Sequence, residues 1–181
     1  MTCAFLYRLL LFHCLTGGPP DTSYLENIRQ LMTDIRNNRI MSDTLFISRQ
    51  AYPLHTEYCE ELWNDTVNLT AAERLELHSP THDTLIKTWT SDLVGGAAYL
   101  VKSDSLIEAT KVMGPNNFDF YLNIKGGLWS FSTPLFLRHG ELCLIEISSY
   151  SGPMSASNRL SLFKKINGHW KEVRFFCSGI S

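Results

Sequence analysis

The C-terminal part of the chain constrains the fold most, because three runs of β-forming residues follow one another there. Residues 142–150 are rich in Leu, Ile, Cys and Tyr, and at their start both alternating sets of positions are apolar. This pattern is typical of a central strand that is covered on both faces. Residues 160–165 and 170–176 make the other two runs, and Asn167-Gly168 between them can supply the positive φ angles that a type I′ hairpin needs. We therefore expect a three-stranded antiparallel meander.

Two short segments flank the first strand of this meander. Residues 138–140, Arg-His-Gly, precede the first strand and predict a tight turn. Residues 151–157 are small and polar, which is typical of a mobile or ligand-facing loop. Trp170 and Val173 have opposite parity, so a regular strand would point them to opposite faces. That offset predicts either a β-bulge in the last strand or contacts on both of its faces.

The first half of the chain carries helix signals instead. Residues 23–40 begin with Ser23 and Glu26, the pair that forms a capping box, and continue with apolar residues at helical spacing. Thr70 and Glu73 repeat the capping pattern. Further helices are predicted over residues 55–63, 70–77, 83–89 and 103–112, and further strands over residues 44–52, 97–101 and 118–124. Helices followed by antiparallel strands are typical of an α+β fold, so we predict a single domain with N-terminal short helices packed on a C-terminal antiparallel β-meander.

Length, charge and the length of the apolar runs limit the class of protein. The 181 residues suit one domain and can bury a sizeable core. The formal net charge is −2 and no basic run occurs, which argues against a nucleic-acid partner. No apolar run is long enough to span a bilayer, so we expect no transmembrane span.

Residues 1–18 resemble a short secretion signal, which would leave residues 19–181 as the domain. Arg8 precedes an apolar run, and small residues follow it. His13 inside the apolar run is unusual for a signal, so the alternative is an N-terminal strand or buried helix. With a signal, the protein is secreted or located in the periplasm or cell envelope; without one, it stays in the cytoplasm.

The cysteines leave the redox state open. Cys59, Cys143 and Cys177 remain if residues 1–18 are removed. They allow either one disulfide and one free thiol or three buried thiols. Cys143 lies in an apolar strand, where the simplest interpretation is a small core residue.

A set of residues in the C-terminal half follows the pattern F-S-x-P-x-F, then G, Y, G, L, K-K and G-x-W. The residues that carry it are Phe120, Tyr121, Gly127, Phe131, Ser132, Pro134, Phe136, Gly140, Tyr150, Gly152, Leu162, Lys164, Lys165, Gly168 and Trp170. On these residues the region resembles the C-terminal half of small exported bacterial proteins, often from Bacteroidetes, whose function is uncharacterised. The resemblance implies export and an α+β fold, and it implies no activity. Those proteins often carry a Cys-Gly pair where this chain has Ser151-Gly152, so no role of that cysteine is transferred.

No metal or cofactor is expected from the motifs. His78, His82 and Asp83 come nearest to a set of zinc ligands, but Pro80 interrupts the helix that would place both histidines on one face.

One carboxylate stands out because it interrupts an apolar strand. Glu146 lies in the middle of the run of residues 142–150. A carboxylate on a covered face must be paired, or its pKa rises. The simpler interpretation is that Glu146 points to solvent, and the alternative is a pair with a cation such as Arg159 or Lys164 on a neighbouring strand.

Residues 139–151 contain the residue types that a hydrolytic site uses. His139 stands near Glu141, and several serines follow. A nucleophile needs a base within hydrogen-bond reach and a third group that orients the base. No G-x-S-x-G motif marks an exposed serine, and His139 in Arg-His-Gly is more simply a turn residue.

The leading functional prediction is an exported protein that binds a partner or ligand without catalysis, because no catalytic or cofactor motif is specific. We expect the contact surface to include Trp129, His139, Tyr150 and Ser151, with an unidentified protein or small ligand as the partner. One alternative is a hydrolase with a His/Glu/Ser site in the region just described, and another is an inhibitor or immunity-type protein that blocks another protein's site. A broad exposed aromatic patch would favour binding, whereas a cleft that gathers His139, Glu146 and a serine would favour the enzyme.

Overall fold

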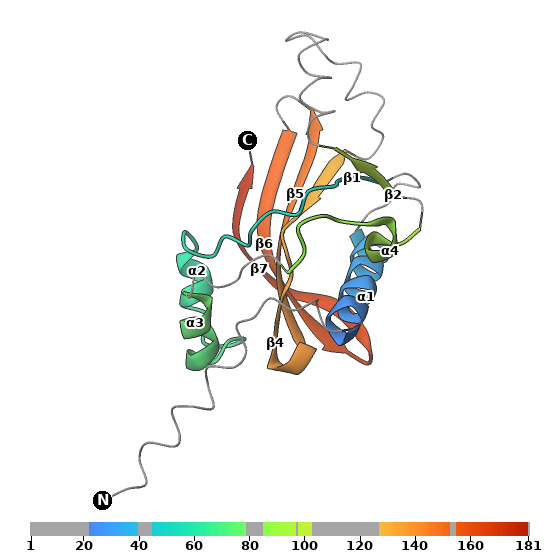
Figure 1. Ribbon diagram of the computed structural model, residues 1–181. Coiled ribbons are helices and arrows are strands. Elements are labelled where there is room, and N and C mark those ends of the chain that lie inside the picture. The colour runs from blue at the N-terminus through green and yellow to red at the C-terminus, as the bar shows by residue number, and fades with distance from the viewer. Residues whose placement is uncertain are drawn as a thin grey trace, which may run out of the picture.

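The computed structural model describes residues 22–39, 45–78, 85–96, 98–102, 127–152 and 155–180. In this part of the chain a curved mixed sheet carries α1 and α4 on one face and α2 and α3 on the other (Figure 1). The predicted α+β class is confirmed. The helices are α1 (Thr22–Arg39), α2 (Glu60–Trp63), α3 (Ala71–Leu77), α4 (Ser91–Val94) and the 3-10 turn η1 (Arg138–Gly140). The strands are β1 (Leu45–Ser48), β2 (Ala98–Val101), β3 (Leu128–Phe131), β4 (Leu135–Leu137), β5 (Leu142–Gly152), β6 (Ser155–Ile166) and β7 (His169–Ile180).

The sheet is larger and less regular than the predicted meander. Its order is β2-β1-β3-β5-β6-β7, and β4 pairs with the first part of β5. Strands β5, β6 and β7 form the expected antiparallel meander. The purely antiparallel expectation is wrong for the other side of the sheet, because β1 lies parallel to both β2 and β3. Parallel neighbours need long connections, and in the sequence β1 is far from both of its parallel partners, which begin at Ala98 and Leu128.

Strand β5 is covered on both faces, as its sequence predicts. Cys143, Ile145 and Ile147 pack in the core beside α1, whereas Leu142 and Leu144 pack in the core beneath α2 and α3. All five are at most 2 % exposed. We call the two sides of the sheet the α1 face and the α2–α3 face.

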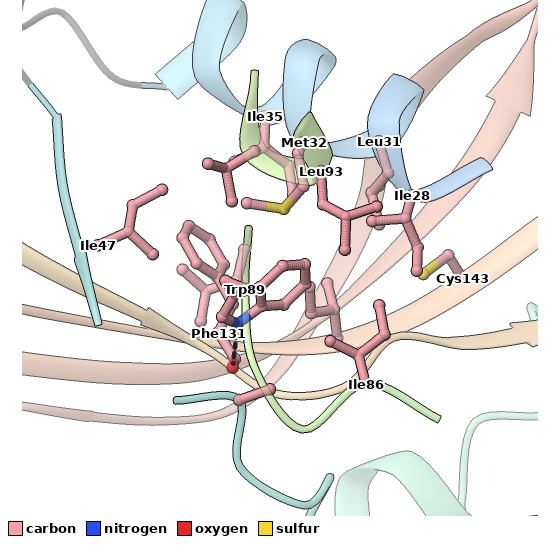
Figure 2. Packing of buried hydrophobic residues seen from close by; sticks show 14 of the residues in the cluster. Ile28, Leu31, Met32, Ile35, Ile47, Ile86, Trp89, Leu93, Phe131 and Cys143 are labelled. Atoms are coloured by element: carbon pink, nitrogen blue, oxygen red, sulfur yellow. Dashed lines mark hydrogen bonds between the residues drawn. The ribbon is translucent and has the colours of Figure 1, made fainter. Parts of the chain in front are cut away.

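The core on the α1 face attaches the first helix to the sheet (Figure 2). Ile28, Leu31 and Ile35 recur at helical spacing along α1 and are at most 1 % exposed. They belong to one cluster with Trp89, whose indole N–H donates a hydrogen bond to the carbonyl of Phe131 at 3.2 Å. The helix predicted over residues 23–40 is confirmed within one residue at each end.

The core on the α2–α3 face is closed by a disulfide as well as by apolar packing. Cys59, the residue before α2, is bonded to Cys177 on β7. Cys143 is a buried free thiol on the other face, and burial raises its pKa well above the usual value. Of the two arrangements that the sequence allows for Cys59, Cys143 and Cys177, the described residues show one disulfide and one free thiol.

Two predicted helices differ in the structure. Only residues 60–63 of the predicted helix 55–63 are helical, because the preceding chain is held against the β3–β4 junction by a bond from Thr133 N–H to the Tyr52 carbonyl. Residues 85–90 contain no helix, although a helix was predicted over 83–89. There the backbone N–H of Trp89 donates to the carbonyl of Arg49 at 2.8 Å, so strand-like pairing takes the place of helical hydrogen bonds.

Three predictions fall on residues outside the described ranges. They are the secretion signal over residues 1–18, the helix over 103–112 and the strand over 118–124.

The predicted irregularity in the last strand is a β-bulge. Leu162 and Phe163 are neighbours on β6, but their partners on β7 are Arg174 and Glu172, so Val173 is passed over in the pairing. The extra residue shifts the following part of the strand to the other face, so Trp170 packs on the α1 face and Phe176 on the α2–α3 face.

The turn between β6 and β7 gives a test of backbone conformation. Asn167 has φ 52° and Gly168 has φ 79°, the positive values that the sequence predicted. We expect Gly168→Ala to lower the free energy of unfolding by about 1 kcal/mol, because a residue with a Cβ is strained at positive φ. Apart from the two neighbouring residues, no atom of the described residues lies within 4 Å of the added methyl group, so a clash would not contribute.

Gly179→Ala is the matched control, since that glycine also faces open space but lacks a positive φ. Urea unfolding of the two variants gives the comparison. If both variants unfold at the same urea concentration as the original protein, the strain argument is wrong.

A carboxylate–arginine pair joins α3 to the turn η1. Thr70 and Glu73 form the predicted capping box at the start of α3. The Glu73 carboxylate also accepts two hydrogen bonds from Arg138, at 2.7 and 2.9 Å. These bonds with Arg138 lower the pKa of Glu73 from 4.5 to about 2, and the bonds from Thr70 add to the effect.

The lowered pKa of Glu73 predicts an acid-sensitive contribution to stability. The contribution is fully present above about pH 4.5, the unfolded value, and is lost as the pH falls toward the folded value of about 2. We expect a loss of about 1–2 kcal/mol over this range, since the Arg138 side chain is 35 % exposed and solvent weakens the pair. Urea unfolding between pH 5 and pH 2 measures it. Glu73→Gln should flatten this part of the profile, and parallel profiles for the two proteins would contradict the assignment.

Candidate functional site

The α2–α3 face of β5 changes from apolar to polar at Glu146. Leu142 and Leu144 lie in the core beneath α2 and α3, and the next residues on the same face are Glu146 and Ser148. Beyond the edge of the helical layer, this face is bordered by the extended segment of residues 52–58. A polar surface is therefore partly enclosed between β5, β6 and this segment.

The Glu146 carboxylate is buried, and its two oxygens differ. The residue is 9 % exposed. Oε1 accepts a hydrogen bond of 2.6 Å from the side-chain amide of Asn158 on β6. Oε2 lies 3.5 Å from Nδ1 of His55 and receives no hydrogen bond from the described residues. A buried acceptor without a donor costs about 1–3 kcal/mol, and more if charged, so this atom calls for a functional explanation.

Tyr52 holds this part of β5 in place. Its hydroxyl donates to the backbone carbonyl of Glu146 at 3.2 Å and lies 3.2 Å from Oγ of Ser148. Its ring is nearly parallel to that of His55, with 6.3 Å between the centroids. Burial raises the pKa of Tyr52 well above its usual value, so the hydroxyl remains a proton donor at ordinary pH.

A pocket of about 160 Å³ adjoins the carboxylate, and we call it the Glu146 pocket. It is lined by His55, Tyr58, Cys59, Glu146, Asn158, Leu160 and Cys177. The lining therefore combines one carboxylate, one imidazole, one amide and the apolar surface of Leu160 and the disulfide. The His55 side chain is 51 % exposed and Tyr58 is 87 % exposed, so both can be reached from solvent.

The surroundings of the pocket are acidic. Exposed glutamates occur next to its lining residues, at Glu57, Glu60 and Glu61. Glu61 accepts a hydrogen bond from the backbone N–H of Cys177 at 3.3 Å, which places its carboxylate beside the disulfide. Arg174 on β7 lies 3.7 Å from the buried carboxylate of Asp65, so its charge is already balanced. The local field therefore favours a positively charged group.

The structure places Glu146 differently from either sequence-based interpretation. Its carboxylate does not point to solvent, and it is not paired with Arg159 or Lys164. Arg159 is opposite Ile147 and so lies on the α1 face, whereas Lys164 is opposite Leu142 near the start of β5. His55 and Asn158 take the place of the expected cation.

The residues predicted as a contact surface do not form one cluster. His139 lies in η1 before β5, whereas Tyr150 and Ser151 lie near the end of β5. At about 3.3 Å per residue, the eight steps from residue 142 to residue 150 span roughly 26 Å. Trp129 pairs with Ser149 and packs against the core of the α1 face, so its side chain and that of Tyr150 point to opposite faces. The predicted hydrolytic set is divided in the same way, because His139 is remote from the serines of β5.

Other sequence candidates contribute no further site within the described residues. His82 and Asp83 lie outside those residues, and the ring of His78 packs on Trp63 with 4.4 Å between the centroids. No group of three or more metal-ligating side chains occurs in the part of the chain that is described.

Comparisons of this chain with protein-family models, with curated proteins and with solved structures found no match. Among the described residues, no helix has the length and apolar character needed to cross a membrane.

Proposed function

We propose that this chain is an exported protein that binds a ligand or partner non-enzymatically, and that the Glu146 pocket is its binding site. The observation that carries the proposal is the buried Oε2 of Glu146, which receives no hydrogen bond from the described residues and borders a pocket open to solvent. A ligand that supplied this donor would recover the unfavourable energy of the buried oxygen as binding energy.

The rest of the site supports binding because its geometry is fixed in advance. Asn158 orients one carboxylate oxygen, and Tyr52 bonds to the backbone carbonyl of the same residue. A carboxylate held in this way loses little conformational entropy when a ligand arrives. Tyr150 lies on the same face of β5, four residues beyond Glu146, so a longer ligand or a polypeptide partner could extend from the pocket to this predicted contact residue.

Export is supported by the Cys59–Cys177 disulfide. Disulfides persist in oxidising compartments such as the periplasm and the extracellular space, and they are rare in the cytosol. The resemblance to small exported bacterial proteins points the same way. We therefore propose a secreted, periplasmic or envelope location, and mass spectrometry of fractionated cells tests it.

The binding function is tested by ligand-observed NMR with a fragment set that contains cations, anions, sugars and neutral apolar compounds. We expect the original protein to bind at least one class saturably, and Glu146→Gln to lose that binding. Glu141→Gln is the matched control, because it removes an exposed carboxylate at η1, near the other end of β5. Absence of saturable binding, or binding that Glu146→Gln retains, would refute the proposal.

A hydrolase is the second candidate, and the His55–Glu146 pair is the observation that favours it. A carboxylate 3.5 Å from Nδ1 can orient the imidazole so that Nε2 acts as a base. The nearest serine of the site, Ser148, bonds to Tyr52 and Asn158, which does not activate it as a nucleophile. Hydrolysis of an activated ester that disappears in His55→Ala and persists in Glu141→Gln would support this candidate over pure binding.

A further inference from the structure

We propose that the Glu146 pocket recognises a primary ammonium group at the end of a short alkyl chain. This inference rests on the proposed binding function and names the chemical class of its ligand. Three properties of the pocket support it, namely its charge, its hydrogen-bonding groups and its shape.

The charge of the pocket selects a cation. Glu146 supplies the carboxylate of the lining, and none of the described lining residues is Lys or Arg. Glu61 adds a second carboxylate near the disulfide wall. A cation that enters such a site is attracted to it, whereas an anion would be repelled by the Glu146 carboxylate.

The hydrogen-bonding pattern selects an ammonium group that carries N–H donors. Asn158 already satisfies Oε1, so the remaining demand is for a donor to Oε2. This oxygen lies next to the imidazole of His55, whose half-exposed side chain can change rotamer and give a ligand access to it. A primary ammonium has three donors in a compact head, and a charge-assisted bond to a carboxylate is about twice as strong as a neutral one. A quaternary ammonium has the same charge and no donor.

The shape of the pocket suits a short alkyl chain behind that head. A volume of about 160 Å³ holds only a small group, roughly five times the volume of one water molecule in the liquid. Leu160 and the disulfide offer apolar contact, and the exposed ring of Tyr58 lies at the rim. A straight chain of about four carbons would remove this apolar surface from water, each methylene contributing about 0.8 kcal/mol when fully buried.

Titration of the 15N-labelled protein with n-butylammonium chloride, followed by 1H–15N NMR, tests the inference. We expect saturable shifts at the backbone amides of His55, Asn158 and their neighbours. Tetramethylammonium, which lacks donors, and butyrate, which has the opposite charge, should produce weaker shifts or none. Glu146→Gln should weaken n-butylammonium binding by about tenfold or more, the equivalent of one charge-assisted hydrogen bond. Glu141→Gln should leave it unchanged, and the urea midpoint of each variant shows whether the fold is intact.

The ammonium group could belong to a free amine or to a lysine side chain of a polypeptide. Nα-acetyl-lysine methylamide carries the same head and chain, so it serves as the probe for the second source. Tighter binding of n-butylammonium indicates a free amine, and tighter binding of the lysine derivative indicates a polypeptide; both results support the ammonium class.

The outcomes separate this inference from the function on which it rests. If tetramethylammonium or butyrate binds as well as n-butylammonium, or if Glu146→Gln binds n-butylammonium normally, the ammonium inference is overturned. If another class of fragment binds in the pocket and ammonium does not, the binding function stands and the inference falls. If no class binds, both are refuted.

Discussion

Removal of the Cys59–Cys177 disulfide should lower the free energy of unfolding by about 4 kcal/mol. The two cysteines are 118 residues apart in sequence, and a cross-link that closes so long a loop restricts the unfolded chain by about 4–5 kcal/mol in the chain-entropy description. The native state also loses a connection, because the bond attaches the start of α2 to an edge strand of the sheet. Thermal unfolding should then occur roughly 10 °C lower.

The measurement is urea unfolding of the protein with and without a reductant. A Cys59→Ser/Cys177→Ser double variant should resemble the reduced protein, and its stability should not respond to the reductant. This second property is the control, since it separates the disulfide from any effect of the reductant on the rest of the molecule. An original protein whose urea midpoint is the same in both conditions would contradict the expected contribution.

The same bond also bears on the binding site. Cys59 and Cys177 both line the Glu146 pocket, and Tyr58 is the neighbour of Cys59. Reduction should therefore loosen one wall of the pocket while Glu146 and Asn158 remain on the sheet. Ligand binding that survives reduction would locate the binding determinants on the sheet side of the pocket.

The parts of the fold that the sequence predicted depend on neighbours in the chain. The turn at Asn167-Gly168 needs two residues that tolerate positive φ, and the capping box of α3 needs Thr70 and Glu73 at a spacing of three. The two-sided burial of β5 follows from the apolar residues at both parities. Each of these signals involves residues only a few positions apart in the sequence, and intrinsic propensity and periodicity determine local structure over such short distances.

The parts that the sequence did not predict depend on contacts between distant residues. Tyr52 and Glu146 are 94 positions apart, and the hydrogen bond between them arises only because the chain after β1 crosses the β3–β4 junction. The parallel placement of β1 likewise depends on long connections between strands. Glu146 itself was conspicuous as a carboxylate in an apolar strand, but no local pattern points to His55 as its neighbour.

The prediction from periodicity was also wrong for the segment that contains Trp89, because the same spacing of apolar residues fits a helix or a buried extended chain. A helix is predicted over residues 83–89, yet Trp89 pairs through its backbone with Arg49. The side chain enters the core of the α1 face, where the ring lies edge-on to that of Phe131 at 6.1 Å between the centroids. Tertiary contacts therefore decide the local conformation here.

Trp89→Ala should lower the free energy of unfolding by about 4 kcal/mol, the range found when a large buried aromatic side chain is truncated. Trp89 is 0 % exposed, and it packs among Leu31, Met32 and Leu93 (Figure 2). The change would leave a cavity between α1 and the sheet, and it would also remove the donor to the carbonyl of Phe131. Both losses act on the core that attaches α1 to the strands.

Trp89→Phe separates these two contributions, and it keeps the prediction testable if Trp89→Ala does not fold. It retains an aromatic ring but loses the N–H, so we expect a smaller loss of about 2 kcal/mol. Trp63→Phe is the matched control, because Trp63 is only partly buried and its indole N–H has no hydrogen-bond partner among the described residues. Removing an unsatisfied donor should cost less than about 1 kcal/mol. Urea unfolding that ranks Trp63→Phe as the more damaging change would mean that Trp89 and its bond to Phe131 do not stabilise the α1 core as argued.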